Sequence, residues 1–285
     1  MTDSVPGRLS ISRATLDDWQ VVSGWAKDEG WNPGLRDGPC FFAQDPEGFF
    51  IGRIEGQAVS AISVVNYDEV YAFLGFYLVR PDLRGHGHGL ATWQTALAHA
   101  GTRTVGLDGV VAQQANYRRS GFELAHRTVR YMGSVPPGAA RSAQILPVEA
   151  AGLRAITAYD AASHPADRPR FLASWLTAPG HRALARIVDG RITGYGVLRP
   201  ADGALRIGPL FADTRADAEE LFDALTAEAD GTPVLIDVPE TQPQAVALAE
   251  ARGMKPTFET ARMYTGPVRE LAQERVFGVT TLELG

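Results

Sequence analysis

The amino-acid sequence predicts a mixed α and β fold made of two similar halves, and three observations carry this prediction. Apolar runs with the alternation of strands are interspersed with stretches that have the period of helices. RIEGQAVSAISVV (53–65) resembles RIVDGRITGYGVL (186–198), and GFELAHRTVRYMG (121–133) resembles GMKPTFETARMYTG (253–266). Both pairs have nearly the same separation, which indicates an internal repeat of about 135 residues. The 285-residue length also favours two domains.

The boundary between the halves is expected at SVPPGAAR (134–141), where paired prolines and small residues discourage regular structure. The sequence therefore predicts one domain over 1–134 and a second over 142–285.

The first half is expected to open with a strand over 9–14 and a helix that Thr15 and Asp18 cap and that runs to Lys27. A strand over 71–79 is apolar on both faces, as in the centre of a sheet. The other expected elements are a hairpin over 49–66 that turns at Gly56, a helix over 89–100, a strand over 104–108, a short helix over 113–120 and a strand over 123–132.

The second half repeats this order. Its expected helices lie near 149–158, 168–178, 214–229 and 242–251, and its strands near 182–189, 191–199, 204–211, 234–237 and 258–265. The last segment, VFGVTTLELG, alternates as a strand and is expected to pair within the second domain.

Composition and charge argue against some classes of partner and indicate a cellular compartment. The net charge is −6 and the 27 Lys and Arg residues form no run longer than Arg118-Arg119, which argues against nucleic acid as a partner. The longest apolar run, 71–79, is too short to cross a bilayer, and the first residues do not resemble a signal peptide. The single cysteine, Cys40, fits a reducing compartment, so a cytoplasmic protein is expected.

The stretch Arg84-Gly85-His86-Gly87-His88-Gly89 lies between the buried strand and a predicted helix. Free backbone N–H groups and the positive end of a helix dipole suit phosphate there, and Arg84 adds a cation. The spacing fits neither a P-loop nor a dinucleotide fingerprint. A metal site would need a third ligand besides the two histidines, and a plain glycine-rich turn is the remaining alternative.

Two motifs give the chain a family resemblance. FYLVRPDLRGHGHG followed by LATWQTAL resembles the acyl-CoA motif of the GNAT superfamily of N-acetyltransferases, Arg/Gln-x-x-Gly-x-Gly/Ala, with Arg84, Gly87 and Gly89 in its positions. About 30 residues later, Tyr117-x-x-x-Gly121-Phe122 matches the superfamily's Tyr-x-x-x-Gly-Phe. IGPLFAD (207–213) and ARMYTG (261–266) look like the second, degenerate domain of a two-domain bacterial GNAT group.

The resemblance implies an α+β fold of tandem GNAT-like domains, each a central, mostly antiparallel sheet flanked by helices. It also implies acetyl-CoA as co-substrate and an amine acceptor. No metal is expected, because the two histidines lack a third ligand. The implied acetyl-CoA-binding residues are Tyr77, Leu78, Val79, Arg84, Gly85, His86, Gly87, His88, Gly89, Leu90 and Asn116. In this set the backbone of 77–79 would bind pantetheine, and the amides of 85–90 would hold the pyrophosphate, with the histidine side chains pointing outward.

Tyr117 is the expected catalytic residue. Attack by an amine on the thioester releases a thiolate, and a neutral tyrosine can donate a hydrogen bond or a proton to it. Core packing is the alternative role for Tyr117, a surface position for Arg84, and a helix cap for Asn116. No general base can be read from the sequence, because Asp108 has an equivalent in Asp237 of the second half, which favours a structural role.

The second half lacks the glycine-rich loop. ADTRADAEELFDAL stands in its place, and its acidic helix start would repel a pyrophosphate. Ala249 takes the place of Tyr117. We therefore expect one acetyl-CoA site, in the first half.

The leading hypothesis is an N-acetyltransferase in which the amine attacks acetyl-CoA directly in a ternary complex. The alternative is a non-catalytic acetyl-CoA sensor or interaction module, and a histidine-dependent metalloprotein is a third reading. A small-molecule amine is the expected acceptor, with a protein amine left open, and a homodimer is possible.

Overall fold

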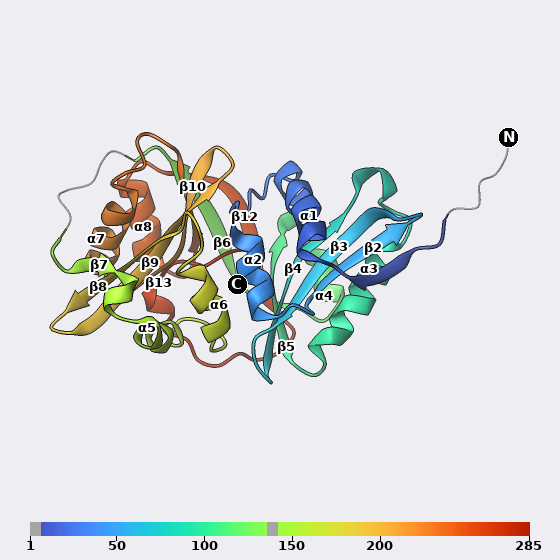
Figure 1. Ribbon diagram of the computed structural model, residues 1–285, viewed down its shortest axis with the longest axis horizontal. Helices are drawn as coiled ribbons and strands as arrows, with labels where there is room; N and C mark the ends of the chain where they lie inside the picture. Colours follow the sequence, from blue (N-terminus) through green and yellow to red (C-terminus); the bar gives the residue numbers. More distant parts are fainter. Residues whose placement is uncertain (1–6, 136–141) are drawn as a thin grey trace.

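The computed structural model describes residues 7–135 and 142–285, and its described strands form one continuous sheet (Figure 1). The sheet order is β1-β2-β3-β4-β5-β12-β6-β11-β10-β9-β8-β7, with β13 pairing to β10. The strands are β1 Ser10–Arg13, β2 Phe49–Ile54, β3 Gln57–Asn66, β4 Tyr71–Val79, β5 Thr104–Val110, β6 Glu123–Gly133, β7 Ile145–Pro147, β8 Arg182–Val188, β9 Arg191–Ala201, β10 Ala204–Ala212, β11 Val234–Pro239, β12 Lys255–Tyr264 and β13 Val276–Gly278.

The sheet is mostly antiparallel, and helices cover both of its faces. Among the described strands, only the pairs β4–β5 and β10–β11 are parallel. The helices are α1 Leu16–Asp28, α2 Asp37–Gln44, α3 His88–Leu97, α4 Gln114–Arg119, α5 Leu153–Asp160, α6 Pro169–Trp175, α7 Arg215–Thr226 and α8 Pro243–Ala251. This architecture confirms the predicted fold class.

The described residues form three apolar core clusters. One cluster joins the halves: it contains side chains of α1, α2, α5 and α6, and Phe41 of α2 stacks on Trp175 of α6 with ring centroids 6.2 Å apart. The other two clusters lie under α3 and α4 in the first half and under α7 and α8 in the second. The halves therefore share one helical layer and have separate layers elsewhere.

The two halves exchange a strand at the centre of the sheet. β12 of the second half lies between β5 and β6 of the first, and β6 of the first half lies between β12 and β11 of the second. Each half is thus completed by a strand that the other half supplies, which Figure 1 shows as β6 and β12 side by side in the middle of the molecule.

Two equivalent ion pairs fasten the exchanged strands. Arg262 of β12 lies opposite Asp108 of β5 and contacts it through two hydrogen bonds, of 3.0 and 2.7 Å. Arg130 of β6 lies opposite Asp237 of β11 and makes two more, of 2.7 and 3.1 Å. All four side chains are buried, so Asp108 has the structural role that its counterpart Asp237 indicated.

Most predicted elements occur where the sequence placed them. The capping box of Thr15 and Asp18 opens α1, and β4 is an interior strand. Part of the proposed linker, 136–141, lies outside the described residues. No helix in the described part of the chain has the length and apolar character needed to cross a membrane.

The last segment differs from the prediction. Only Val276–Gly278 form a strand, which pairs with β10 as expected for the second half. The chain then leaves the sheet, and residues 279–285 are buried between the halves, where Figure 1 places residue 285. The alternating apolar pattern of this segment thus reflects burial on several sides and not one longer strand.

Candidate active site

A cleft opens where β4 separates from β5. The two strands pair from Tyr71 to Leu74 and then part, while β4 continues beside β3 as far as Val79. At the point of separation Phe76 has a φ of 47°, an unusual conformation for a bulky residue, and the register to β3 shifts there. Along residues 77–79, the backbone edge of β4 that faces the cleft is therefore not hydrogen-bonded to β5.

The glycine-rich stretch borders this cleft. Gly85 and Gly87 have φ values of 81° and 84°, which favour glycine, and α3 begins at His88 with no side-chain cap. A Cβ at Gly89 would lie 2.7 Å from the Tyr77 hydroxyl oxygen, so any other residue would force side chains of β4 to move. The first amides of α3 are therefore free to bind an anion.

The cleft contains a cavity of about 530 Å³. It brings together these predicted residues: Tyr77, Leu78, Val79, Arg84, Gly85, Gly87, Gly89, Leu90 and Tyr117. Further lining comes from Glu29, Trp31, Leu83, Val110, Ala112, Gln113 and Phe258, which the sequence did not single out. The size is within the range of small-molecule sites.

Arg84 lies at the mouth of the cavity. Its Nε donates to the Val79 carbonyl at 3.0 Å, and its guanidinium pairs with Glu29. Its side chain is 49% exposed, so solvent screens this pair and the guanidinium can turn toward an anion.

Tyr117 lies on the inner wall. Its ring stacks with Trp93, centroids 5.8 Å apart, and a Cβ at Gly109 would lie 2.7 Å from the ring. Burial raises the pKa of Tyr117 above its usual value, and the nearby Tyr77 raises it further. The hydroxyl therefore stays protonated at neutral pH.

Asn116 and the two histidines are not in this cavity's lining. Asn116 borders an adjoining pocket, where its side chain bonds to those of Gln113 and Arg119. His86 and His88 have ring centroids 6.1 Å apart. Within 7–135 and 142–285 no three His, Cys, Asp or Glu side chains are grouped as metal ligands.

A small inner chamber of about 30 Å³ adjoins the cleft between the separated strands. Tyr117, Tyr77, Trp31 and Phe258 line both spaces. Glu283, from the segment after β13, lines the chamber as well. Phe258 and Glu283 belong to the second half, so the first-half cleft is completed by the other half of the chain.

The equivalent gap of the second half is filled. β10 and β11 pair only from Leu205 to Ile207 and then separate, as β4 and β5 do. β13 lies in the resulting gap: it pairs with β10 at Leu210 and Phe211, and the Val279 amide donates to the Asp237 carbonyl of β11 at 2.9 Å. The chain's own backbone thus occupies the space that is open in the first half.

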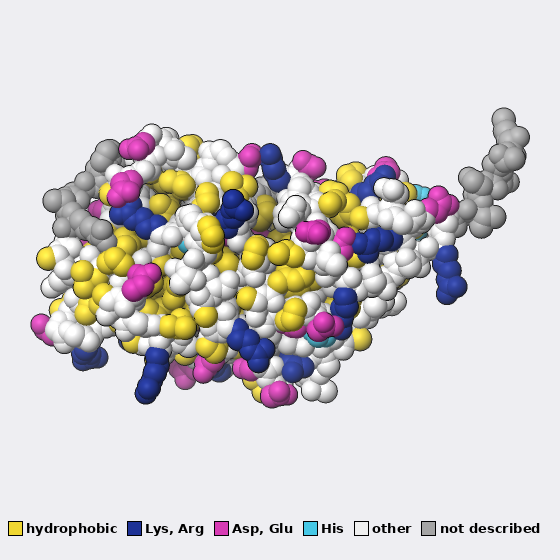
Figure 2. Space-filling view, in the orientation of Figure 1, with side chains coloured by type: hydrophobic (Ala, Val, Ile, Leu, Met, Phe, Trp, Pro, Cys, Tyr) yellow, Lys and Arg dark blue, Asp and Glu magenta, His cyan; other side chains and the backbone are white. Residues whose placement is uncertain are grey.

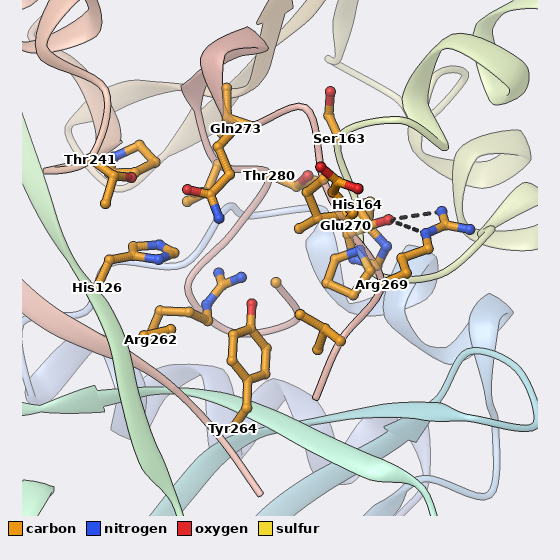
Figure 3. A pocket seen from close by; sticks show the side chains of 18 of the residues that line it. His126, Ser163, His164, Thr241, Arg262, Tyr264, Arg269, Glu270, Gln273 and Thr280 are labelled. Atoms are coloured by element: carbon orange, nitrogen blue, oxygen red, sulfur yellow. Dashed lines mark hydrogen bonds between the residues drawn. The ribbon is translucent and has the colours of Figure 1, made fainter. Parts of the chain in front are cut away.

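Beside this filled gap lies a second cavity, of about 640 Å³ (Figure 3). His126, Arg262 and Tyr264 point into it from β6 and β12, facing Gln273. Burial and nearby Arg262 lower the pKa of His126 to about 4, so the ring is neutral. The described residues place no glycine-rich loop at this cavity, and Arg262 is already paired with Asp108.

On the face seen in Figure 2, charged side chains of one sign do not gather into a patch. Lys and Arg side chains are scattered there among Asp and Glu, with apolar patches between them. The chain's net charge of −6 agrees with this mixture.

Comparison with known proteins identifies both halves. The model of the acetyltransferase (GNAT) family matches residues 12–122, and a second acetyltransferase (GNAT) domain model matches 156–278. A holothin acyltransferase from a Pseudoalteromonas strain is 34% identical over 274 residues, covering 95% of this chain and 93% of that protein.

Solved structures share the fold. A putative acetyltransferase from Pyrococcus horikoshii superposes with a TM-score of 0.80 at 22% identity, covering 100% of this chain and 99% of its own. A tandem GNAT protein from the clavulanic acid biosynthesis pathway has a TM-score of 0.65 at 18% identity, covering 91% and 99%. Tandem arrangement of such domains is thus found among its structural neighbours.

Proposed function

Because the chain belongs to the GNAT acetyltransferase family and is an acyltransferase, we propose that its first half transfers an acetyl group from acetyl-CoA to a small-molecule amine. The observation that carries the proposal is the first-half cleft, where an unpaired β4 edge, a glycine loop at a helix start and a buried tyrosine border one cavity. In the second half, β13 occupies the equivalent gap, and the residues described there bring none of these three features to it.

The residues of the cleft fit acetyl-CoA. Amides of residues 85–90 and the Arg84 guanidinium suit the pyrophosphate, and the edge of 77–79 can pair with the amides of pantetheine as a further strand would. Acetyl-CoA supplies a thioester carbonyl, which a backbone amide at Leu78 can polarise. His86, His88 and Asn116 stay proposed contacts at the border of this site.

Tyr117 acts on the leaving group. The amine nitrogen bonds to the carbonyl carbon, the C–S bond breaks, and the Tyr117 hydroxyl donates a hydrogen bond to the developing thiolate. The raised pKa of Tyr117 keeps the donor neutral, so hydrogen-bond donation is favoured over complete proton transfer. The small-molecule acceptor is supported by the relative that acylates holothin.

The test is an assay of thiol release from acetyl-CoA with a panel of amines that includes holothin, with mass spectrometry of the products. The expected result is thiol release that depends on the amine, with one acetyl group added to it. Binding of acetyl-CoA without amine-dependent thiol release would instead support the sensor alternative.

A further inference from the structure

The segment after β13 passes from the second half into the first-half site. After Val279 it reaches Gly75 of β4, where a Cβ would lie 2.0 Å from the Glu283 carbonyl oxygen. The Tyr67 hydroxyl donates to the Leu284 carbonyl at 2.7 Å, and the Leu284 amide donates to the Thr281 hydroxyl at 2.8 Å. Glu283 is therefore held on a pinned backbone at the point where β4 leaves β5.

The Glu283 carboxylate is buried but incompletely bonded. Its side chain is 2% exposed, Oε1 lies 3.4 Å from an Arg206 nitrogen, and Oε2 has no hydrogen-bond partner among the described residues. Arg206 makes shorter bonds elsewhere, of 2.7 Å to Asp237 and 2.6 Å to the Asn32 carbonyl. A buried carboxylate oxygen without a donor is costly, which indicates that a donor arrives with a ligand.

Glu283 belongs to a buried cluster of charged side chains. Three buried arginines, Arg130, Arg199 and Arg206, face the buried carboxylates Asp37 and Asp237. With Glu283 counted, the cluster holds three arginines and three carboxylates, and a buried cluster favours such a match. Asp108, the other carboxylate in the chamber lining, is engaged through both oxygens by Arg262.

We propose that Glu283 is the carboxylate that binds the acceptor amine and takes its proton, an inference that rests on the proposed acetyl transfer. As the nitrogen–carbon bond forms and the carbon–sulfur bond breaks, one N–H proton passes from the amine to Oε2 of Glu283. Tyr117 donates its hydrogen bond to the sulfur from the same chamber lining. The thiolate later takes up a proton from solvent, and Glu283 releases one, so charge and protons balance.

Glu283→Gln tests this assignment, because the amide keeps the size of the side chain and removes the base. We expect kcat to fall about 100-fold or more, the range for a general base, with the Kd of acetyl-CoA unchanged. Glu274→Gln is the matched control: it lies just before β13, is exposed, and is expected to retain wild-type kcat.

Glu283→Asp is the second variant and keeps the charge but shortens the reach. Its kcat is expected between those of wild type and Glu283→Gln, and it carries the test if the glutamine variant does not fold. Wild-type kcat in either folded variant would overturn the role of Glu283 and leave the acetyl transfer standing. A wild-type protein that acetylates no amine would overturn both.

Discussion

The two halves of the molecule begin with the same geometry and use it differently. In each half two parallel strands pair for a short stretch and then separate. In the first half the gap is a cavity of about 530 Å³ beside a glycine-rich helix start. In the second half β13 fills the gap with backbone that pairs to β10.

This difference shows how a duplicated site can be converted into structure. A backbone strand can satisfy the unpaired edge of β10 permanently, in the place where pantetheine is proposed to pair with β4 in the first half. The same chain then continues past Thr280 to deliver Glu283 to the open cleft. The filled half is thus a structural part of the proposed site in the other half.

Of the variants that distinguish the two halves, Tyr117→Phe is expected to have the largest effect, a loss of kcat. Loss of the hydroxyl removes the donor to the thiolate, so kcat should fall by about 100-fold or more while the Kd of acetyl-CoA stays unchanged. Steady-state kinetics together with calorimetric binding would measure both quantities.

The control is Tyr264→Phe, in the cavity of the second half, which should keep wild-type kcat. Equal losses in the two variants would mean that the halves do not differ in this way. No loss in Tyr117→Phe would show that Tyr117 only packs.

The ion pairs of the exchanged strands predict an effect on the free energy of unfolding. Removing one member of a buried ion pair costs about 3–5 kcal/mol, so both Asp108→Asn and Asp237→Asn should lower the free energy of unfolding by this order. Asp237 should have the greater effect, because both Arg130 and Arg206 bond to it. Burial alone would raise the pKa of Asp237, and these two arginines outweigh it and hold that pKa below its usual range.

Urea unfolding measures these changes. Glu219→Gln is a surface control: its pair with Arg215 is half-exposed and should contribute less than about 1 kcal/mol. If the two aspartate variants were no less stable than this control, the ion pairs would not fasten the strand exchange.

Much of the fold could be predicted because local patterns determine it. The continuous apolar run of 71–79 and the capping box at Thr15 are properties of neighbouring residues, and both elements occur as expected. The strand exchange could not be predicted in this way. Pairing of β6 with β12 depends on tertiary packing between segments far apart in the sequence, and either half could have closed on itself.

In the candidate site, too, residues in local motifs could be predicted and residues brought in by tertiary packing could not. The loop and Tyr117 carry local motifs, and the structure brings most of them to one cavity. Trp31 lies between α1 and α2 without any motif, and Phe258 and Glu283 come from the second half. The only sequence signal for Glu283 was an alternating terminal segment, which indicates burial but not a neighbour.

The smallest expected effect concerns the pH dependence of stability and arises from buried histidines. Burial lowers the pKa values of His126, His164 and His181, with neighbouring arginines adding to the effect. These rings are neutral in the folded chain, whereas the unfolded chain binds protons below about pH 6.5. Unfolding therefore takes up protons, and stability should fall as pH drops from about 7 to about 5.

Each such histidine contributes up to about 1.4 kcal/mol per pH unit. Urea unfolding across this range would measure the slope, and His126→Asn should make it shallower. A stability that rises toward acid pH would contradict the burial of these rings in neutral form.

The number of acetyl-CoA molecules bound per chain tests the central claim most directly. Isothermal titration of the wild-type protein should give one site per chain. Gly87→Val, which places a branched side chain at a φ of 84° in the loop, should abolish that site, whereas Gly190→Val, at a φ of 75° in an exposed turn of the second half, should retain it. Two sites per chain, or full binding by Gly87→Val, would contradict the account.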